Sequence, residues 1–220
     1  FYLKEEKLID NPQKNFNELL NIYGSILGLT EEEYGKISQY SAYVFTKIAD
    51  LYRLTNNPKD GLDHINAAVK IINKCTERGK FINKKFIWYT TITQSNLLLQ
   101  NGSYQSPRKT ALGLLNVVDE KNDIDTYFEL ISIAFRGSNT PNLFEEVISI
   151  FNKSDISKIR EANSENLTYK VANIFDMISR HYNRLNNRKK SKLYFSKSID
   201  LLAKNNLKDE QYYSKLLSYA

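Results

Sequence analysis

The sequence predicts an all-α protein, a solenoid of about five stacked helix pairs with a capping helix at its C-terminal end. Three observations point to this fold class. Apolar residues recur at three- and four-residue steps along most of the chain, which is the period of an α-helix. Only 8 glycines and 4 prolines occur in 220 residues, too few for a protein with many tight β-turns. The same two-helix spacing also occurs twice, over residues 42–75 and 172–205.

The two copies of this spacing align when Tyr52 is placed on Tyr182. Large residues, small residues and the asparagines of the turn then fall at equivalent positions: Phe45/Phe175, Ile48/Ile178, Ala49/Ser179, Asn56/Asn186, Asn57/Asn187, Gly61/Ser191, Ile65/Phe195 and Ala68/Ser198. A helix pair of this size cannot bury its apolar face alone, so it stacks on neighbours. The copies lie 130 residues apart, which leaves room for roughly three less regular pairs between them.

Two helices are expected before the first turn. Apolar periodicity predicts one helix over residues 12–28, closed by Gly28. Thr30 followed by three glutamates has the pattern of a helix start, with a capping hydroxyl and acidic groups near the positive helix end. A second helix is therefore predicted over residues 30–54, and Asn56-Asn57-Pro58 ends it.

The rest of the chain continues the helical pattern without a linker long enough to separate two domains. One repeat domain over residues 1–220 is therefore expected. The further predicted helices cover residues 59–74, 83–100, 106–118, 123–136, 141–152, 155–162 (a short one), 165–185, 189–204 and, as the cap, 209–219.

Charge, cysteine content and hydropathy indicate the environment in which the protein is expected to work. The net charge of +6 is a local feature, because residues 180–220 carry +7 and residues 1–179 carry −1. The single cysteine, Cys75, excludes an intrachain disulfide and fits a reducing, cytoplasmic location; we expect it to be a small buried apolar residue. No apolar run reaches the ~18–20 residues of a membrane span. The start has no methionine and no signal-peptide core, so we expect a further domain before Phe1.

The repeated spacing resembles the tetratricopeptide repeat, a 34-residue pair of helices with large residues in the first helix and small ones near the crossing. The resemblance is carried by the two windows 42–75 and 172–205. It implies a right-handed solenoid with a concave groove that binds peptides or proteins. Repeats of this type serve many partners, so the fold alone does not choose among them.

The chain is also rich in Asn, Ile, Lys and Tyr and poor in cysteine. A degenerate repeat domain of this size and composition resembles the C-terminal sensor half of Gram-positive peptide-pheromone receptors, the Rgg/PlcR/PrgX group of transcription regulators. That resemblance implies a short linear peptide in the groove, a homodimer, and DNA contact only through a missing N-terminal domain. The alternative is a constitutive scaffold that holds another protein and senses nothing.

Candidate peptide contacts follow from the first-helix positions that face the groove in this repeat type. In the second copy these positions hold polar side chains, whose amides and guanidinium groups suit a peptide backbone and a carboxylate: Asn173, Asp176, Arg180, Asn183 and Arg184. An ordinary solvated helix face would have the same composition.

In the first copy the equivalent positions hold Tyr43, Thr46, Asp50, Arg53 and Leu54, which are less basic. The middle helix adds Trp88, Tyr89, Gln94 and Asn96, and Asn96 stands among leucines, so it is either paired in the core or directed at a ligand; the core is favoured.

A basic turn is formed by five cations: Arg184, Arg188, Lys189, Lys190 and Lys192. A solvated loop is the simplest interpretation, and an acidic partner or phosphate contacts are the alternatives. His64 and His181 have no metal-ligand spacing around them, and no phosphate loop or hydrolase motif occurs. We therefore expect a binding protein that is not an enzyme, with no catalytic residues, no metal site and no cofactor.

Overall fold

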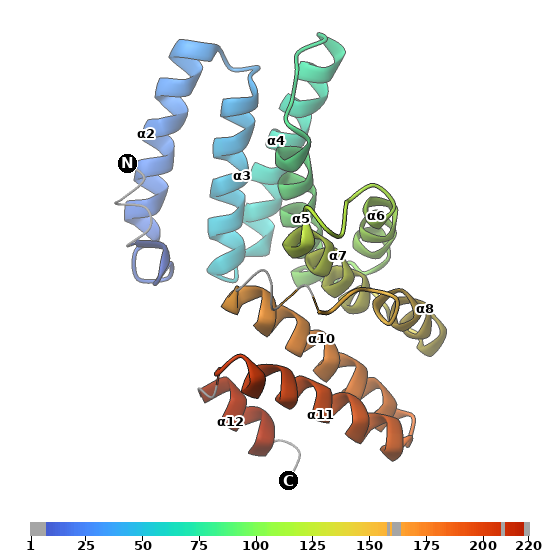
Figure 1. Ribbon diagram of the computed structural model, residues 1–220. Coiled ribbons are helices and arrows are strands. Elements are labelled where there is room, and N and C mark those ends of the chain that lie inside the picture. The colour runs from blue at the N-terminus through green and yellow to red at the C-terminus, as the bar shows by residue number, and fades with distance from the viewer. Residues whose placement is uncertain (1–7, 158, 160–163, 208–209, 218–220) are drawn as a thin grey trace. The chain divides into compact units, whose positions relative to one another are not determined.

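The computed structural model describes residues 8–157, 159, 164–207 and 210–217, and all the regular secondary structure among them is α-helical (Figure 1). This confirms the predicted all-α class. The packing divides the chain into two compact units, Phe1–Thr110 (unit 1) and Ala111–Ala220 (unit 2), and α6 (Gln105–Leu115) crosses the boundary between them.

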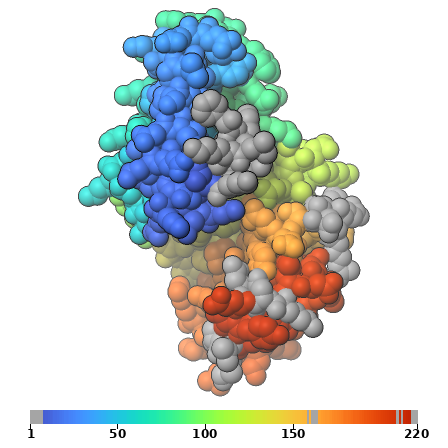
Figure 2. All heavy atoms as spheres, turned by 90° about the vertical axis from the view of Figure 1, so that its left-hand side faces the viewer, coloured from blue at the N-terminus to red at the C-terminus, as the bar shows by residue number. Residues whose placement is uncertain are grey.

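Unit 1 contains four long helices, each packed on its neighbour in the chain. They are α2 (Phe16–Tyr34), α3 (Gln39–Leu54), α4 (Pro58–Glu77) and α5 (Lys84–Gln100). Helix α5 packs on α3 as well as on α4, so α3 has a partner on three sides. Residues of α2 form much of the face of unit 1 that Figure 2 turns to the viewer.

The predicted break at Gly28 and helix start at Thr30 are wrong. Helix α2 runs through both residues, and the Thr30 hydroxyl donates to the Leu27 carbonyl of its own helix (2.9 Å) instead of capping a new one. The helix ends at Gly35, whose φ of +79° suits glycine and whose N–H donates to Glu31 O. The next helix starts after Ser38, whose side chain accepts the Ser41 N–H.

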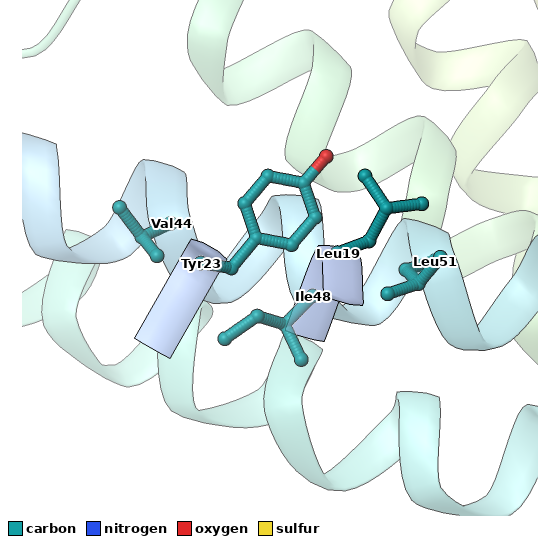
Figure 3. Close-up of a cluster of buried hydrophobic side chains, with 5 residues drawn as sticks. All are labelled: Leu19, Tyr23, Val44, Ile48 and Leu51. Carbon is teal, nitrogen blue, oxygen red and sulfur yellow. The ribbon is translucent and has the colours of Figure 1, made fainter. Parts of the chain in front are cut away.

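The core of unit 1 begins between α2 and α3. Figure 3 shows its buried residues: Leu19 and Tyr23 from α2, with Val44, Ile48 and Leu51 from α3. A fully buried aliphatic side chain of this kind contributes about 1.5–3 kcal/mol, so this layer fixes α2 on the first helix of the repeat. A second cluster, on the other side of α3, contains Cys75, which is fully buried as expected.

The first repeat has its two helices, α3 and α4, in close contact. The turn between them places Asn56 at a φ of +57°, a conformation that asparagine tolerates better than most residues. At Gly61 an added Cβ would lie 2.6 Å from Leu97 Cδ2 and 3.2 Å from the Ala49 carbonyl oxygen. The absence of a side chain at Gly61 therefore leaves room for Leu97 of α5 and for the close backbone of α3.

Unit 2 contains the second repeat and the predicted cap. Its helices are α7 (Ile124–Arg136), α8 (Pro141–Phe151), α10 (Glu165–Arg184), α11 (Arg188–Lys204) and α12 (Glu210–Leu217). Helix α10 packs on α7, α8 and α11, and α12 follows on α11. The predicted short helix over residues 155–162 lies largely outside the described residues, as do the ends of the predicted cap.

Unit 2 is held by aromatic packing and by the ion pairs of a largely covered lysine, Lys170. Phe128, Phe135 and Phe151 are almost fully buried, and the Phe151 ring contacts each of the other two edge-on. Lys170 of α10 reaches α7, where its Nζ lies 2.8 Å from Asp125 Oδ1 and 3.0 Å from Glu129 Oε2. Burial acts to lower the pKa of Lys170, but the charges and hydrogen bonds of these carboxylates outweigh it and raise the pKa above 10.5. Lys170 therefore stays charged and ties the second repeat to α7.

Among the helices that the structure describes, none combines the length and the apolar character needed to cross a membrane.

Candidate ligand-binding groove

Unit 1 carries an open groove of about 560 Å³ between α3 and the start of α5. Its lining combines four aromatic rings, two side-chain amides and two lysines: Tyr40, Tyr43, Phe86, Tyr89, Gln39, Asn83, Lys47 and Lys85. The groove follows from the helical period, because Gln39, Tyr43 and Lys47 are four residues apart and share one face of α3. Asn83 caps α5 by accepting the Lys85 N–H (2.9 Å), which fixes the end of the groove.

The rings of the groove are preorganised by contacts with one another. The Tyr43 ring lies 5.8 Å from Phe86 and 6.4 Å from Tyr89, measured between centroids. Lys47 Nζ stands 5.7 Å from the centre of the Tyr43 ring. Tyr40 and Tyr43 nevertheless keep 47% and 38% of their surfaces exposed, so the aromatic surface is open to a ligand.

A carboxylate closes the inner part of this surface. Asp50 Oδ1 lies 2.6 Å from Arg53 Nε, and its Oδ2 accepts a hydrogen bond from the Tyr89 hydroxyl (3.4 Å). Burial first, and then the charge of Asp50, raises the pKa of Tyr89 above its usual 10.0, so the phenol remains a protonated donor at neutral pH. Asp50 and Arg53 thereby hold Tyr89 in place from the far side of the groove.

The predicted residues of unit 1 fall in three environments. Tyr43 lines the groove, and Asp50 and Arg53 lie next to it as a bonded pair that supports Tyr89. Asn96 is only 6% exposed, which agrees with the favoured prediction of a core amide. Thr46, at another expected groove position, is fully buried and hydrogen-bonded to Thr90 of α5 (3.1 Å).

The predicted residues of unit 2 do not form one open surface. Asn173, Asn183 and Arg184 are exposed on α10. Asp176 is only 8% exposed, and its carboxylate contacts Arg180 (2.9 Å) and Lys215 of α12 (3.7 Å). Helix α12 therefore lies beside the position at which a peptide contact was expected.

Most residues of the groove were not predicted from the sequence. Tyr40, Phe86, Lys47 and Lys85 were not predicted as contacts, because an aromatic residue at helical spacing is more often core than surface. For the α3 side of the groove, the signal that could have found it is the pairing of Tyr40 and Tyr43 with Lys47 on one face of the helix.

The two histidines have packing roles in the structure. His64 stacks on Tyr52 with ring centres 5.3 Å apart, and His181 stacks on Phe144 at 4.4 Å. Within the described ranges, no three His, Cys, Asp or Glu side chains gather as metal ligands would.

The chain was compared with known proteins. No protein-family model, curated protein or solved structure matches it.

Proposed function

We propose that this chain is a peptide-binding domain of the helical-repeat type, and that the groove between α3 and α5 holds a short extended peptide. The observation that carries the proposal is the composition of the groove, with four aromatic rings, two amides and two ammonium groups around about 560 Å³. Ligand sites are typically concave, mostly apolar and supplied with a few polar groups that fix orientation.

Each component of the groove matches one part of a peptide. The rings of Tyr43, Phe86 and Tyr89 offer contact area to an apolar or aromatic side chain. The amides of Gln39 and Asn83 suit the N–H and C=O groups of an extended backbone. The α3 residues that line the groove span roughly 12 Å at 1.5 Å per residue, which an extended segment of about four residues covers.

The wider proposal is that the chain senses this peptide. In that account the two units belong to one right-handed solenoid of tetratricopeptide type, the chain forms a cytoplasmic homodimer, and a tethered DNA-binding domain responds to the bound state. A peptide that prefers one conformation would shift the population toward it. The shared spacing of α3–α4 and α10–α11 supports the repeat part of this account.

A scaffold that binds a folded partner is the second candidate, and one observation favours it. The aromatic surface continues beyond the groove, because Tyr40 contacts Tyr34 (ring centres 4.3 Å apart), which is itself 46% exposed. A larger partner would use this continuation. The two candidates differ in the length of ligand that each requires.

The test is selection of heptapeptides from a random display library on the full chain. We expect peptides that raise the melting temperature of the chain. At a peptide concentration one hundred times the Kd, the added free energy of unfolding should be about 2.7 kcal/mol. Tyr43→Ala and Phe86→Ala should abolish the shift. Tyr104→Ala, which removes another exposed tyrosine that lies outside the groove, should leave it unchanged.

The scaffold proposal would replace the sensor proposal if no heptapeptide could be selected and if a folded protein bound the wild-type chain but not Tyr43→Ala. Selected peptides that bind Tyr43→Ala and Phe86→Ala as tightly as the wild type would refute the site.

A further inference from the structure

Unit 2 contains a second hollow, which lies beside the basic turn. It encloses about 450 Å³ and is lined by residues of α8, α10 and α11 and of the turn after α8. Lys190 of the basic turn lines it from one side, and Asn152 and Lys153 line it from another. Lys189 and Lys192 belong to the same basic turn but are not part of the lining. The cations of the turn are therefore not equivalent.

Lys190 is held in place, unlike a freely solvated lysine. Its Nζ lies 4.6 Å from the centre of the Tyr182 ring and donates to the Tyr182 hydroxyl oxygen at 3.4 Å. Its backbone N–H is bound by Asn187 Oδ1 (3.1 Å), so the start of α11 fixes the root of the side chain as well. The ammonium group is thus preorganised at the edge of the hollow.

Two stacked tyrosines, each with a hydrogen-bonded hydroxyl, line the hollow. Tyr182 and Tyr194 are both buried and stack with ring centres 5.7 Å apart. The Tyr182 hydroxyl donates to Glu145 Oε2 (3.0 Å), and the Tyr194 hydroxyl donates to Asn152 Oδ1 (3.2 Å). Burial first, and then the bond to Glu145, raises the pKa of Tyr182, which keeps the phenol protonated in this arrangement.

The carboxylate of the hollow is engaged by its neighbours. Besides accepting from Tyr182, Glu145 has its Oε1 3.5 Å from Nε2 of His181, a ring that is 8% exposed and stacked on Phe144. Two lysines and one carboxylate line the hollow, and four more cations stand in the basic turn. The balance of charge therefore favours an anionic ligand.

We propose that this hollow and the basic turn bind an acidic peptide segment, independently of the groove in unit 1. An acidic side chain of the segment pairs with Lys153 and Lys190, and the amide group of Asn152 is available to its backbone. Further acidic residues pair with the exposed cations of the turn. A peptide fits better than a nucleic acid, because the faces of Tyr182 and Tyr194 are stacked and buried and offer no platform to a base.

The test uses the full chain and a fluorescein-labelled, acetylated and amidated pentaglutamate, with binding followed by fluorescence anisotropy at fixed ionic strength. Lys153→Ala and Lys190→Ala should each weaken binding roughly tenfold, whereas Lys189→Ala and Lys192→Ala should weaken it by about twofold or less. All four side chains are exposed, so the variants are expected to fold. Tyr43→Ala should bind the probe as wild type does.

Several results would overturn the proposal. Equal losses at all four lysines would indicate a diffuse basic patch without a site. Tighter binding of a single-stranded oligothymidylate than of pentaglutamate, with a steep salt dependence, would indicate nucleic acid. Absence of measurable pentaglutamate binding would also refute it, whatever the outcome at the groove of unit 1.

Discussion

The two helix pairs that share one spacing, α3–α4 and α10–α11, join their helices by different chemistry at equivalent positions. In the first pair the crossing is built from Ala49, Gly61 and Ala68, with no side-chain polar atom. In the second the same positions are serines. Ser179 Oγ donates to the Ser191 carbonyl oxygen (2.9 Å), and Ser198 Oγ donates to the Ala172 carbonyl oxygen (2.8 Å).

The exposed faces of these pairs differ in the same way. On α3 the outer positions hold Tyr40 and Tyr43, and α5 beside them leaves an aromatic groove open. On α10 the equivalents are Lys170 and Asn173; Lys170 is used in an ion pair with α7, and Asp176 nearby contacts α12. The shared spacing therefore specifies where the helices of each pair meet, and the side chains determine which pair keeps a face open to a ligand.

The largest effect is expected at the equivalent positions Lys170 and Tyr40. Lys170→Met removes the ammonium group from beside Asp125 and Glu129, and should lower the free energy of unfolding by about 2–3 kcal/mol, below the value for a fully buried pair because Asp125 is exposed. Tyr40→Ala should cost clearly less. Urea unfolding followed by circular dichroism measures both, and equal losses would contradict the assigned roles.

Gly61 and Ser191 give the next contrast. Gly61→Ala places a methyl group against Leu97 and the Ala49 carbonyl, and should destabilise by about 1–3 kcal/mol through overpacking. Ser191→Ala adds no atom of that kind and serves as the matched control. A Gly61→Ala protein as stable as wild type would show that the crossing has room for a methyl group.

Ser198 and Ala68 test the polar crossing directly. Ser198→Ala removes the donor to the Ala172 carbonyl and should cost about 1 kcal/mol. The exchange in the other direction, Ala68→Ser, puts a hydroxyl at the equivalent place in the first pair and should change stability by less than the loss at Ser198. Thermal unfolding measures the stability of both variants. A larger loss of stability for Ala68→Ser than for Ser198→Ala would mean that the two crossings are not equivalent.

The smallest effect concerns pH. The raised pKa of Tyr89 means that the folded chain keeps the phenol proton to higher pH than the unfolded chain. Its contribution to stability is therefore complete below pH 10.0, the ordinary pKa, and is lost as the pH rises through the folded value. Tyr89→Phe should show a shallower loss of unfolding free energy in alkaline solution. An unchanged alkaline slope would show that Tyr89 titrates normally.

Most helices could be predicted because their signals are local. Apolar periodicity and turn residues such as Asn56 and Asn186 determine where the helices of each repeat begin and end. The boundary near Gly28 failed because glycine is tolerated inside a helix and Thr30 could bond within its own turn. Gly35, which does require a positive φ, is the actual end.

The candidate site was less predictable because it depends on which faces neighbours cover. Sequence spacing predicted both Tyr43 and Asp176 as groove residues of their repeats, yet Tyr43 is exposed on the groove and Asp176 is buried beside α12. Nothing in α10 itself signals that Lys215, almost forty residues later in the chain, contacts it. The aromatic residues of α5 could be assigned to the groove only once it was known that α5 packs on α3.

The central claim is that an extended peptide binds between α3 and α5. Hydrogen–deuterium exchange of the full chain, with and without a library-selected heptapeptide, tests it most directly. The account predicts slower exchange over residues 39–54 and 83–100, with no change over α7 and α8, and loss of this protection in Tyr43→Ala. Protection confined to α8, α10 and α11, or none in the presence of a saturating peptide, would contradict it.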